Sequence, residues 1–320
     1  MTHGTETGTR RVRSPARGEV LDAEKRIRPL LPPTPLVESP ELAPRALLKL
    51  ETFQPTGSFK VRGALALLTR LAPGERVVAA SAGNHALGVA WAATALGVEA
   101  TVVVPETAAP AKLAALERFP VELLRHGAGY DEAERHALAL AGEGRRYVSA
   151  YNDPDVIAGG GTLALELPEG PLTIVCPVGG GGLCAGVALW ASGLADVRVV
   201  GVEAEASRSV SAAVAAGRVV PVAVGPTLAD GLAGNLEPGS VTVKLVRAHV
   251  AELVAVTEAE IEEAIRLLVS EHGVVAEGAG AVASAALLAG KVQAQGRPVA
   301  LVTGRNMDTA VLGRILSSPS

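Results

Sequence analysis

The strongest constraint on the fold is a repeated alternation of short valine-rich segments with longer segments of helical periodicity. The valine-rich segments lack a regular alternation of polar and apolar residues, which is typical of strands covered on both faces. Strands that alternate with helices form βαβ units with right-handed crossovers. The chain is therefore predicted to be an α/β protein with parallel sheets, whose strands lie at residues 76–80, 100–104, 121–124, 172–178, 197–204, 252–256 and 298–303.

Local signals identify two further segments. Residues 257–273 are predicted to be a helix, because Thr257 and Glu260 form a capping box and Gly273 can end the helix. The segment from Gly217 to Pro238 is a long connection without a clear period. Connections of that length are uncommon unless they serve a function, so it is predicted to be a loop near the site or an interface element.

The charge and hydropathy patterns limit the partners of this protein. The net charge of −4 argues against a nucleic-acid groove, which would need clustered lysine and arginine. No segment approaches the roughly 20 apolar residues that cross a bilayer, so no membrane partner is expected. The basic stretch at residues 10–20 is predicted to be a frayed terminus, because no apolar signal segment follows it.

The cysteine content points to a reducing compartment. Cys176 and Cys184 are the two cysteines of the sequence, too few for a disulfide framework in a chain of 320 residues. Without further cysteine or histidine ligands they also do not form a zinc site. Both are predicted to be small buried apolar residues, and a cytoplasmic location is expected.

A run of four glycines, Gly179, Gly180, Gly181 and Gly182, lies between a predicted strand and a predicted helix. Glycine allows the backbone to approach a ligand closely, and successive amides at a helix N-terminus bind phosphate. The run lacks the GK[ST] ending of a P-loop, and it lacks the dinucleotide fingerprint although Glu203 follows at roughly the expected distance. The alternative is a flexible loop. The strand–loop–helix context favours a site for a small phosphorylated cofactor.

Lys60 is the second chemically informative residue. It follows Phe59 at the start of an apolar helical segment, where the helix dipole disfavours a cation. Either the lysine is solvated at the surface, or an anionic and reactive group lies beside it. A lysine amine can form a Schiff base with an aldehyde, and pyridoxal phosphate carries both an aldehyde and a phosphate. Lys60 and the glycine run together therefore predict a pyridoxal-phosphate site.

The order of these segments resembles the threonine/serine dehydratase and serine racemase family of fold-type II pyridoxal-phosphate enzymes, which are related to tryptophan synthase β. The resemblance spans Leu31 to Asp308 and is carried by QPTGSFKVRGA, SAGNHALGVA, VIAGGGTLALEL, PVGGGGLCAG, GVEAE, TLADGLA and VTGRNMD. It implies two parallel-sheet α/β lobes with the cofactor between them. The small lobe is expected at 82–153 and the large cofactor-binding lobe at 1–81 and 154–320, with no C-terminal regulatory domain and with assembly as a homodimer or homotetramer.

The resemblance also implies roles for individual residues. Lys60 is the catalytic residue, which holds the cofactor and then acts as the base at the substrate Cα. Phe59 packs beside the cofactor ring, and Asn84 donates a hydrogen bond to its 3′-oxygen. The cofactor phosphate is expected to bind the backbone amides of Gly179, Gly180, Gly181, Gly182 and Leu183. The substrate carboxylate is expected to bind the loop formed by Ser81, Ala82, Gly83, Asn84 and His85.

The expected reaction is β-elimination from a β-hydroxy amino acid such as L-threonine or L-serine, which yields a 2-oxo acid and ammonia. Thr303 matches the family serine that faces the pyridine nitrogen. A hydroxyl stabilises a protonated ring less than a carboxylate does, which favours elimination over transamination. Ala82 stands where serine racemase has its second base, and a methyl group carries no proton, so racemisation is disfavoured.

Other activities stay open at this stage. A β-replacement enzyme is compatible with the residues, and a protein that binds the cofactor without catalysis is disfavoured by the intact Lys60 and Asn84. Leu87 and Gly160 stand where the family often has glutamine, and Arg305 stands where glycine is usual. An arginine in a site loop can bind an additional carboxylate, so a dehydratase specialised for another substrate, such as 3-hydroxyaspartate, is the alternative.

A divalent cation is the remaining cofactor to consider. Several family members bind Mg²⁺ or Ca²⁺ with carboxylates at the positions of Glu203 and a residue near Ser209. Hard cations prefer oxygen ligands that include carboxylates, and Ser207 and Ser209 supply no second charge. The sequence therefore favours the absence of a metal, and leaves Glu203 as the candidate ligand.

Overall fold

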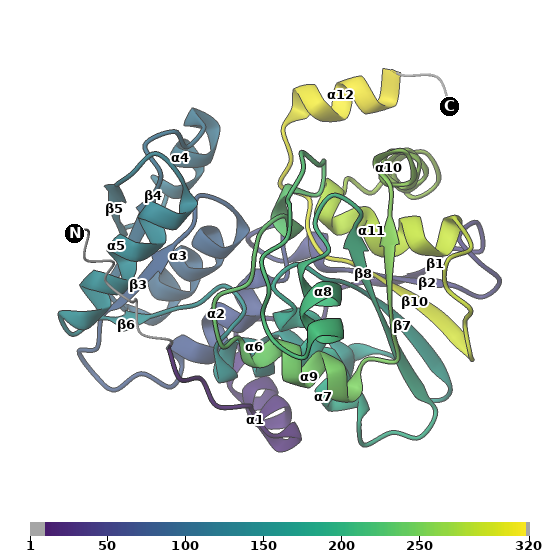
Figure 1. Cartoon of the computed structure of the whole chain (residues 1–320), viewed down its shortest axis with the longest axis horizontal. Helices are drawn as coiled ribbons and strands as arrows, with labels where there is room; N and C mark the ends of the chain where they lie inside the picture. The colour runs from purple at the N-terminus through teal and green to yellow at the C-terminus, as the bar shows by residue number, and fades with distance from the viewer. Residues whose placement is uncertain (1–9, 318–320) are drawn as a thin grey trace.

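A computed structural model describes residues 10–317, in which the chain forms two sheets at opposite sides of the molecule (Figure 1). In the larger sheet all neighbouring strands are parallel except the first pair. Its six strands lie in the order β1 (Leu36–Glu38), β2 (Leu47–Leu50), β10 (Arg297–Val302), β7 (Leu172–Pro177), β8 (Val197–Ala204) and β9 (Glu252–Val256). The predicted α/β class with parallel sheets is confirmed.

The smaller sheet is entirely parallel. Its four strands lie in the order β5 (Glu122–Arg125), β4 (Ala100–Val104), β3 (Val77–Ala80) and β6 (Arg146–Tyr147). The chain thus enters this sheet at Val77, a few residues before the expected start of the small lobe at 82. Three helices accompany the sheet: α3 (Asn84–Leu96), α4 (Pro110–Leu116) and α5 (Tyr130–Gly142).

The remaining helices surround the larger sheet or lie between the two sheets (Figure 1). They are α1 (Arg17–Ile27), α2 (Lys60–Leu68), α6 (Pro154–Gly161), α7 (Gly182–Ala191), α8 (Ser209–Ala216), α9 (Val241–His249), α10 (Glu258–His272), α11 (Gly278–Leu288) and α12 (Thr309–Ser317), with short 3₁₀ turns η1 (Glu51–Phe53), η2 (Thr162–Glu166) and η3 (Asp230–Leu232). Ile174 belongs to the apolar cluster that includes α7, and its neighbour Val175 belongs to the cluster that includes α10 and α11. Both faces of the larger sheet are therefore covered, as the valine-rich strands predict.

The local signals of α10 are confirmed. The Thr257 side chain accepts a hydrogen bond from the backbone of Glu260, and the Glu260 side chain accepts one from the backbone of Thr257. Gly273 follows the helix in the left-handed region, with φ of 61°. Cys176 and Cys184 are buried and free, as expected. Within the described part of the chain, no helix is long and apolar enough to span a membrane.

The prediction of a frayed terminus at residues 10–20 is wrong. Arg17 begins α1, and Val20 is fully buried on that helix. The Arg10 guanidinium donates to the Asn152 carbonyl and pairs with Glu237 at 3.1 Å. These contacts hold the basic stretch on the folded surface, because its charges meet acceptors that are distant in sequence.

A buried ionic cluster anchors the helix that carries Lys60. Arg62 of α2 is fully buried and contacts Glu51 at 2.7 Å and Glu166 at 2.9 Å. Lys49 of β2 also contacts Glu166, at 2.5 Å. Buried charges are tolerated when they are paired and hydrogen-bonded. The cluster therefore joins α2 to β2, η1 and η2, and fixes the start of α2 relative to the larger sheet.

Candidate active site

Lys60 is the first residue of α2, and its amine lies inside the molecule. Nζ donates a hydrogen bond to the Ala150 carbonyl at 2.8 Å and lies 5.2 Å from the centre of the Phe59 ring. Burial disfavours the charged ammonium and lowers the pKa of Lys60 to about 8, although the Glu277 carboxylate opposes this shift. The uncharged amine, which a nucleophile or a base requires, is therefore more accessible near neutral pH than in a solvent-exposed lysine.

The glycine run connects the end of β7 to the start of α7. Gly181 adopts φ of 82°, in the left-handed region that favours glycine. Next to it, a Cβ atom on Gly180 would lie 2.3 Å from the Tyr151 ring, so any larger residue there would clash with that ring. The first N–H groups of a helix have no intrahelical acceptor, so those of Gly182 and Leu183 are available to an anion.

The segment Ala150–Tyr151 brings Lys60 and the glycine run together. Ala150 accepts the hydrogen bond from Lys60, and the ring of the next residue lies against Gly180. The two features that the sequence predicts to bind pyridoxal phosphate therefore face a common segment. An uncharged amine on one side and a glycine cradle at a helix N-terminus on the other fit the aldehyde and the phosphate of that cofactor.

Residues 81–83 connect β3 to α3, and Asn84 and His85 are the first residues of that helix. The Ser81 hydroxyl accepts a hydrogen bond from the Gly83 amide at 3.1 Å, and Ala82 packs at the edge of the apolar cluster beside β4. His85 Nε2 contacts the Val148 carbonyl at 2.8 Å, so this nitrogen carries the proton. Burial, with a contribution from the Lys60 charge, lowers the pKa of His85 to about 3. His85 is therefore a neutral donor that joins α3 to the segment preceding Ala150.

Thr303 lies at the end of β10 beside the start of α2. Its backbone carbonyl accepts a hydrogen bond from the Phe59 amide at 3.0 Å, and its side chain is buried. The Thr303 hydroxyl is 3.4 Å from the Ala279 carbonyl. Ser58 and Gly304 form an isolated bridge next to this contact. The expected pyridine-side residue thus adjoins Phe59 and Lys60.

Glu277, immediately before α11, is a site residue that the sequence analysis did not identify. It accepts a hydrogen bond from Asn84 Nδ2 at 2.6 Å, and its side chain is buried. Burial raises the pKa of Glu277 to about 7, while the Asn84 hydrogen bond and the Lys60 charge oppose the shift. The one local signal is a lone carboxylate between an apolar segment and a glycine-rich helix start.

Arg305 does not extend freely from its loop. Its guanidinium donates to the Thr52 carbonyl, and its backbone amide donates to the Gly57 carbonyl at 2.9 Å. The residue therefore fastens the 303–306 loop to the segment that precedes α2. These contacts give the arginine a structural role in this loop.

Glu203 is engaged by the start of α8. Its carboxylate accepts a hydrogen bond from the Val210 amide at 2.9 Å, and from the amide and hydroxyl of Ser211. Burial raises the pKa of Glu203, and the Ser211 contacts oppose the shift. Among residues 10–317, no group of three His, Cys, Asp or Glu side chains is arranged to bind a metal. Glu203 thus acts as a remote cap of α8.

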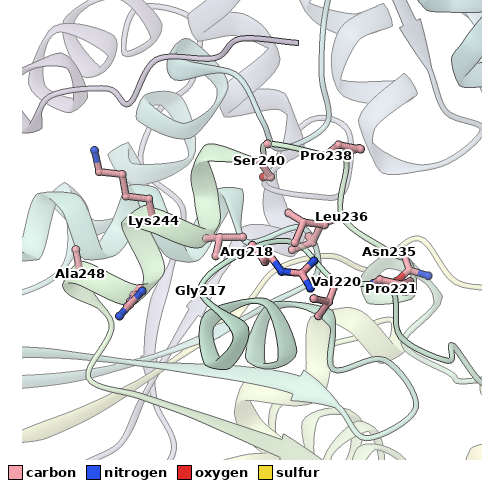
Figure 2. Close-up of a pocket in the computed structure, with 14 residues that line it drawn as sticks. Gly217, Arg218, Val220, Pro221, Asn235, Leu236, Pro238, Ser240, Lys244 and Ala248 are labelled. Atoms are coloured by element: carbon pink, nitrogen blue, oxygen red, sulfur yellow. The ribbon is translucent and has the colours of Figure 1, made fainter. Parts of the chain in front are cut away.

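The long connection at 217–238 contributes to two places. Backbone atoms of Leu232 lie against Gly179, so one part of the connection adjoins the glycine run. Another part lines a cavity of about 980 Å³ together with α9, shown in Figure 2. Arg218 lies in the middle of that view, and the side chain of Lys244 points away from Arg218. None of the predicted site residues lines this cavity.

Comparison with known proteins decides the family. Residues 27–304 match the sequence profile of the family described as pyridoxal-phosphate dependent enzyme. This chain belongs to that family. Pyridoxal phosphate is therefore its cofactor, and the paired Lys60 amine and glycine cradle fit that cofactor. When bound, the cofactor supplies an electron-withdrawing ring that stabilises negative charge at the Cα of an amino acid.

Individual members of the family are similar over most of the chain. The chain is 44% identical to the L-threonine ammonia-lyase of Thermotoga maritima over 279 residues, covering 84% of this chain and 69% of that protein. It is 38% identical to the catabolic L-threonine dehydratase TdcB of Escherichia coli K12, covering 84% of each. The processed form of threonine deaminase isoform 2 from Solanum lycopersicum superimposes with a TM-score of 0.86 at 30% identity, covering 100% of this chain and 99% of that one. Maize serine racemase superimposes with a TM-score of 0.87 at 28% identity, covering 94% and 97%.

Proposed function

We propose that this family member is an ammonia-lyase that eliminates water from L-threonine or L-serine and releases a 2-oxo acid and ammonia. The observation that carries the proposal is the buried Lys60 amine, which has a pKa lowered to about 8 and donates a hydrogen bond to Ala150, the neighbour of the tyrosine that contacts the glycine run. The relatives named L-threonine ammonia-lyase and L-threonine dehydratase, at 44% and 38% identity, support threonine as the substrate.

Each group of residues has one task in this reaction. The amides of the glycine run and Leu183 bind the cofactor phosphate, and Phe59 and Thr303 border the ring. The loop Ser81–His85 binds the substrate carboxylate and so orients the Cα–H bond. Lys60, as an uncharged amine, accepts the Cα proton. The Lys60 ammonium formed in this way returns the proton as the Cβ–O bond breaks, so that the hydroxyl leaves as water, and the released enamine takes up water to give the 2-oxo acid and ammonia.

Two residues select this activity among the alternatives. A racemase needs a proton donor on the face opposite Lys60, and the Ala82 methyl group cannot supply one. The Arg305 guanidinium donates to the Thr52 carbonyl and so has a structural contact in its loop, and the relatives at 44% and 38% identity are named for threonine. Threonine and serine are therefore preferred over 3-hydroxyaspartate.

The test is product analysis of the purified holoenzyme with L-threonine, L-serine and threo-3-hydroxyaspartate in separate reactions. We expect 2-oxo acid and ammonia in equal amounts from threonine or serine, and none from a Lys60→Ala variant. Lys244→Ala changes a lysine that lines the cavity of Figure 2 instead, and should behave like the wild type. Formation of D-amino acid, or product from 3-hydroxyaspartate alone, would refute the proposal.

Assembly and location complete the proposal. A homodimer or homotetramer is expected from the family resemblance. Light scattering of the purified protein as it elutes from a size-exclusion column measures the oligomeric state directly. The cytoplasmic location predicted from the cysteine content is tested by fractionation of the native cells.

A further inference from the structure

The oxygen and the nitrogen of the Asn84 carboxamide each form a hydrogen bond with a side chain that is distant in sequence. Its Oδ1 accepts a hydrogen bond from Asn306 Nδ2 at 2.7 Å, and its Nδ2 donates to Glu277 Oε1 at 2.6 Å. We propose that Asn306 and Glu277 are positioning residues that fix the orientation of this carboxamide and leave one N–H of Asn84 for the ring oxygen of the cofactor. The inference rests on the proposed role of Asn84 in cofactor binding.

The orientation originates at a backbone carbonyl. Asn306 Nδ2 donates to the Thr56 carbonyl at 2.7 Å, and a carbonyl oxygen can only accept. The NH₂ group of Asn306 must therefore face Thr56, and its second hydrogen is directed to Asn84. Asn84 therefore accepts this hydrogen bond with its side-chain oxygen, and its own NH₂ group faces Glu277. We call the three hydrogen bonds that join Thr56, Asn306, Asn84 and Glu277 the relay. The Thr56 carbonyl thus defines the direction of each of them.

The relay ends at Glu277, whose carboxyl oxygen accepts a hydrogen bond as the Thr56 carbonyl does at the other end. Glu277 is 6% exposed, and its Oε1 accepts one hydrogen of the Asn84 NH₂ group. The charged groups that act on this carboxyl are Asp230, Lys112 and Lys60. An NH₂ group carries two hydrogens, so the second hydrogen of Asn84 is left without a partner in the relay. An ionised oxygen on the cofactor ring needs a donor of this kind.

Two glycines of the flanking motifs provide the room for the relay. A Cβ atom on Gly57 would lie 2.5 Å from Asn306 Oδ1, and one on Gly304 would lie 2.2 Å from Glu277 Oε1. Any side chain at either position would displace a member of the relay. The motif segments that contain Gly57 and Gly304 therefore serve to admit Asn306 and Glu277 beside Asn84.

The test compares Asn306→Asp with the wild-type holoenzyme. The aspartate offers acceptors where Asn84 Oδ1 needs a donor, so the carboxamide should turn and present its oxygen to the cofactor. We expect a shift of the visible band of the bound cofactor and about tenfold weaker cofactor binding, the effect of one lost hydrogen bond. Asn235→Asp is the matched control, since Asn235 exchanges hydrogen bonds with Val222 in the distant loop.

A second pair of variants separates the relay from a general loss of structure. Glu277→Gln keeps an oxygen that can accept from Asn84, whereas Glu277→Leu keeps none. We expect the band position to follow the wild type more closely in the glutamine variant than in the leucine variant. An unshifted band and unchanged cofactor affinity in Asn306→Asp would overturn the inference. A wild type that binds the cofactor but releases no 2-oxo acid would instead refute the proposed function.

Discussion

The Tyr151 ring lies against the Gly180 backbone so closely that a Cβ atom at position 180 would fall 2.3 Å from the ring. The Tyr151 hydroxyl also accepts a hydrogen bond from the Glu237 amide at 2.7 Å, which limits the movement of the ring. The glycine run is therefore confined between a fixed aromatic side chain and the space assigned to the cofactor phosphate. The width of the phosphate site depends on this contact.

Gly180→Ala should consequently weaken cofactor binding while the fold is retained. The added methyl group cannot displace the anchored Tyr151 ring, so the loop must move toward the phosphate. We expect at least a tenfold increase in the dissociation constant of pyridoxal phosphate, measured by titration of the apoenzyme. Gly313→Ala in α12 is the control, because a Cβ atom there has no neighbour within 4 Å. Equal affinity in both variants would show that the loop accommodates the methyl group elsewhere.

The protonation of Lys60 should depend on Glu277. The pKa of Lys60 is lowered to about 8, and the Glu277 carboxylate limits that decrease. Only the uncharged amine attacks an aldehyde, so the rate of cofactor uptake by the apoenzyme should rise with pH with a midpoint at about pH 8 and then level off. Glu277→Gln removes the negative charge, so the midpoint should move to lower pH. Stopped-flow absorbance across pH 6 to 10 measures both curves. Glu260→Gln, outside the site, should keep the wild-type midpoint.

The buried cluster around Arg62 should contribute strongly to stability. Glu166→Gln would leave Arg62 and Lys49 with less compensating charge, and loss of one partner in a buried pair costs about 3–5 kcal/mol. Glu252→Gln is the control, because its pair with Arg198 is partly exposed and worth about 1 kcal/mol or less. Denaturant unfolding of the two variants compares these costs. Similar free energies of unfolding in Glu166→Gln and Glu252→Gln would mean that the buried cluster stabilises the fold no more than the exposed pair does.

The same cluster predicts the direction of acid destabilisation. The pKa of Glu166 is lowered to about 2 because the Arg62 and Lys49 interactions exceed the effect of burial. A carboxyl with a depressed pKa in the folded state stabilises the protein above its unfolded pKa, and that contribution is lost as pH falls. The wild type should therefore lose stability between about pH 4.5 and pH 2 more steeply than Glu166→Gln.

The sequence predicts elements best where the signal is local. Seven strands lie within or across the boundaries of the predicted apolar segments, and α10 follows from its capping box. The strand β2 was not predicted, because Lys49 interrupts its apolar pattern. Its ammonium is nevertheless buried against Glu166, so a tertiary ion pair overrides the local preference. The frayed terminus predicted at Arg10 is wrong for the same reason, since its partner Glu237 is 227 residues away.

Within the site, motifs in the sequence predict individual residues but not the hydrogen bonds between them. Lys60, Asn84 and the glycine run stand out because each combines an unusual residue with a helix start. Glu277 and Asn306 act through Asn84, from which they are 193 and 222 residues distant in sequence. No local period marks such contacts. They arise only when α3, α11 and the loop after β10 meet.

Catalysis should not respond to divalent cations at the position of Glu203. Both oxygens of this carboxylate accept hydrogen bonds from the start of α8, which already satisfies the charge that a cation would otherwise meet. Treatment of the holoenzyme with a chelator, followed by Mg²⁺ or Ca²⁺, should leave both the unfolding temperature and the rate of 2-oxo acid formation unchanged. Ser211→Ala removes the hydroxyl that caps this carboxylate and should lower stability without creating a metal response. An increase of the unfolding temperature with added Ca²⁺ that disappears in Glu203→Gln would contradict this assignment and show that the carboxylate exchanges α8 for a metal ion.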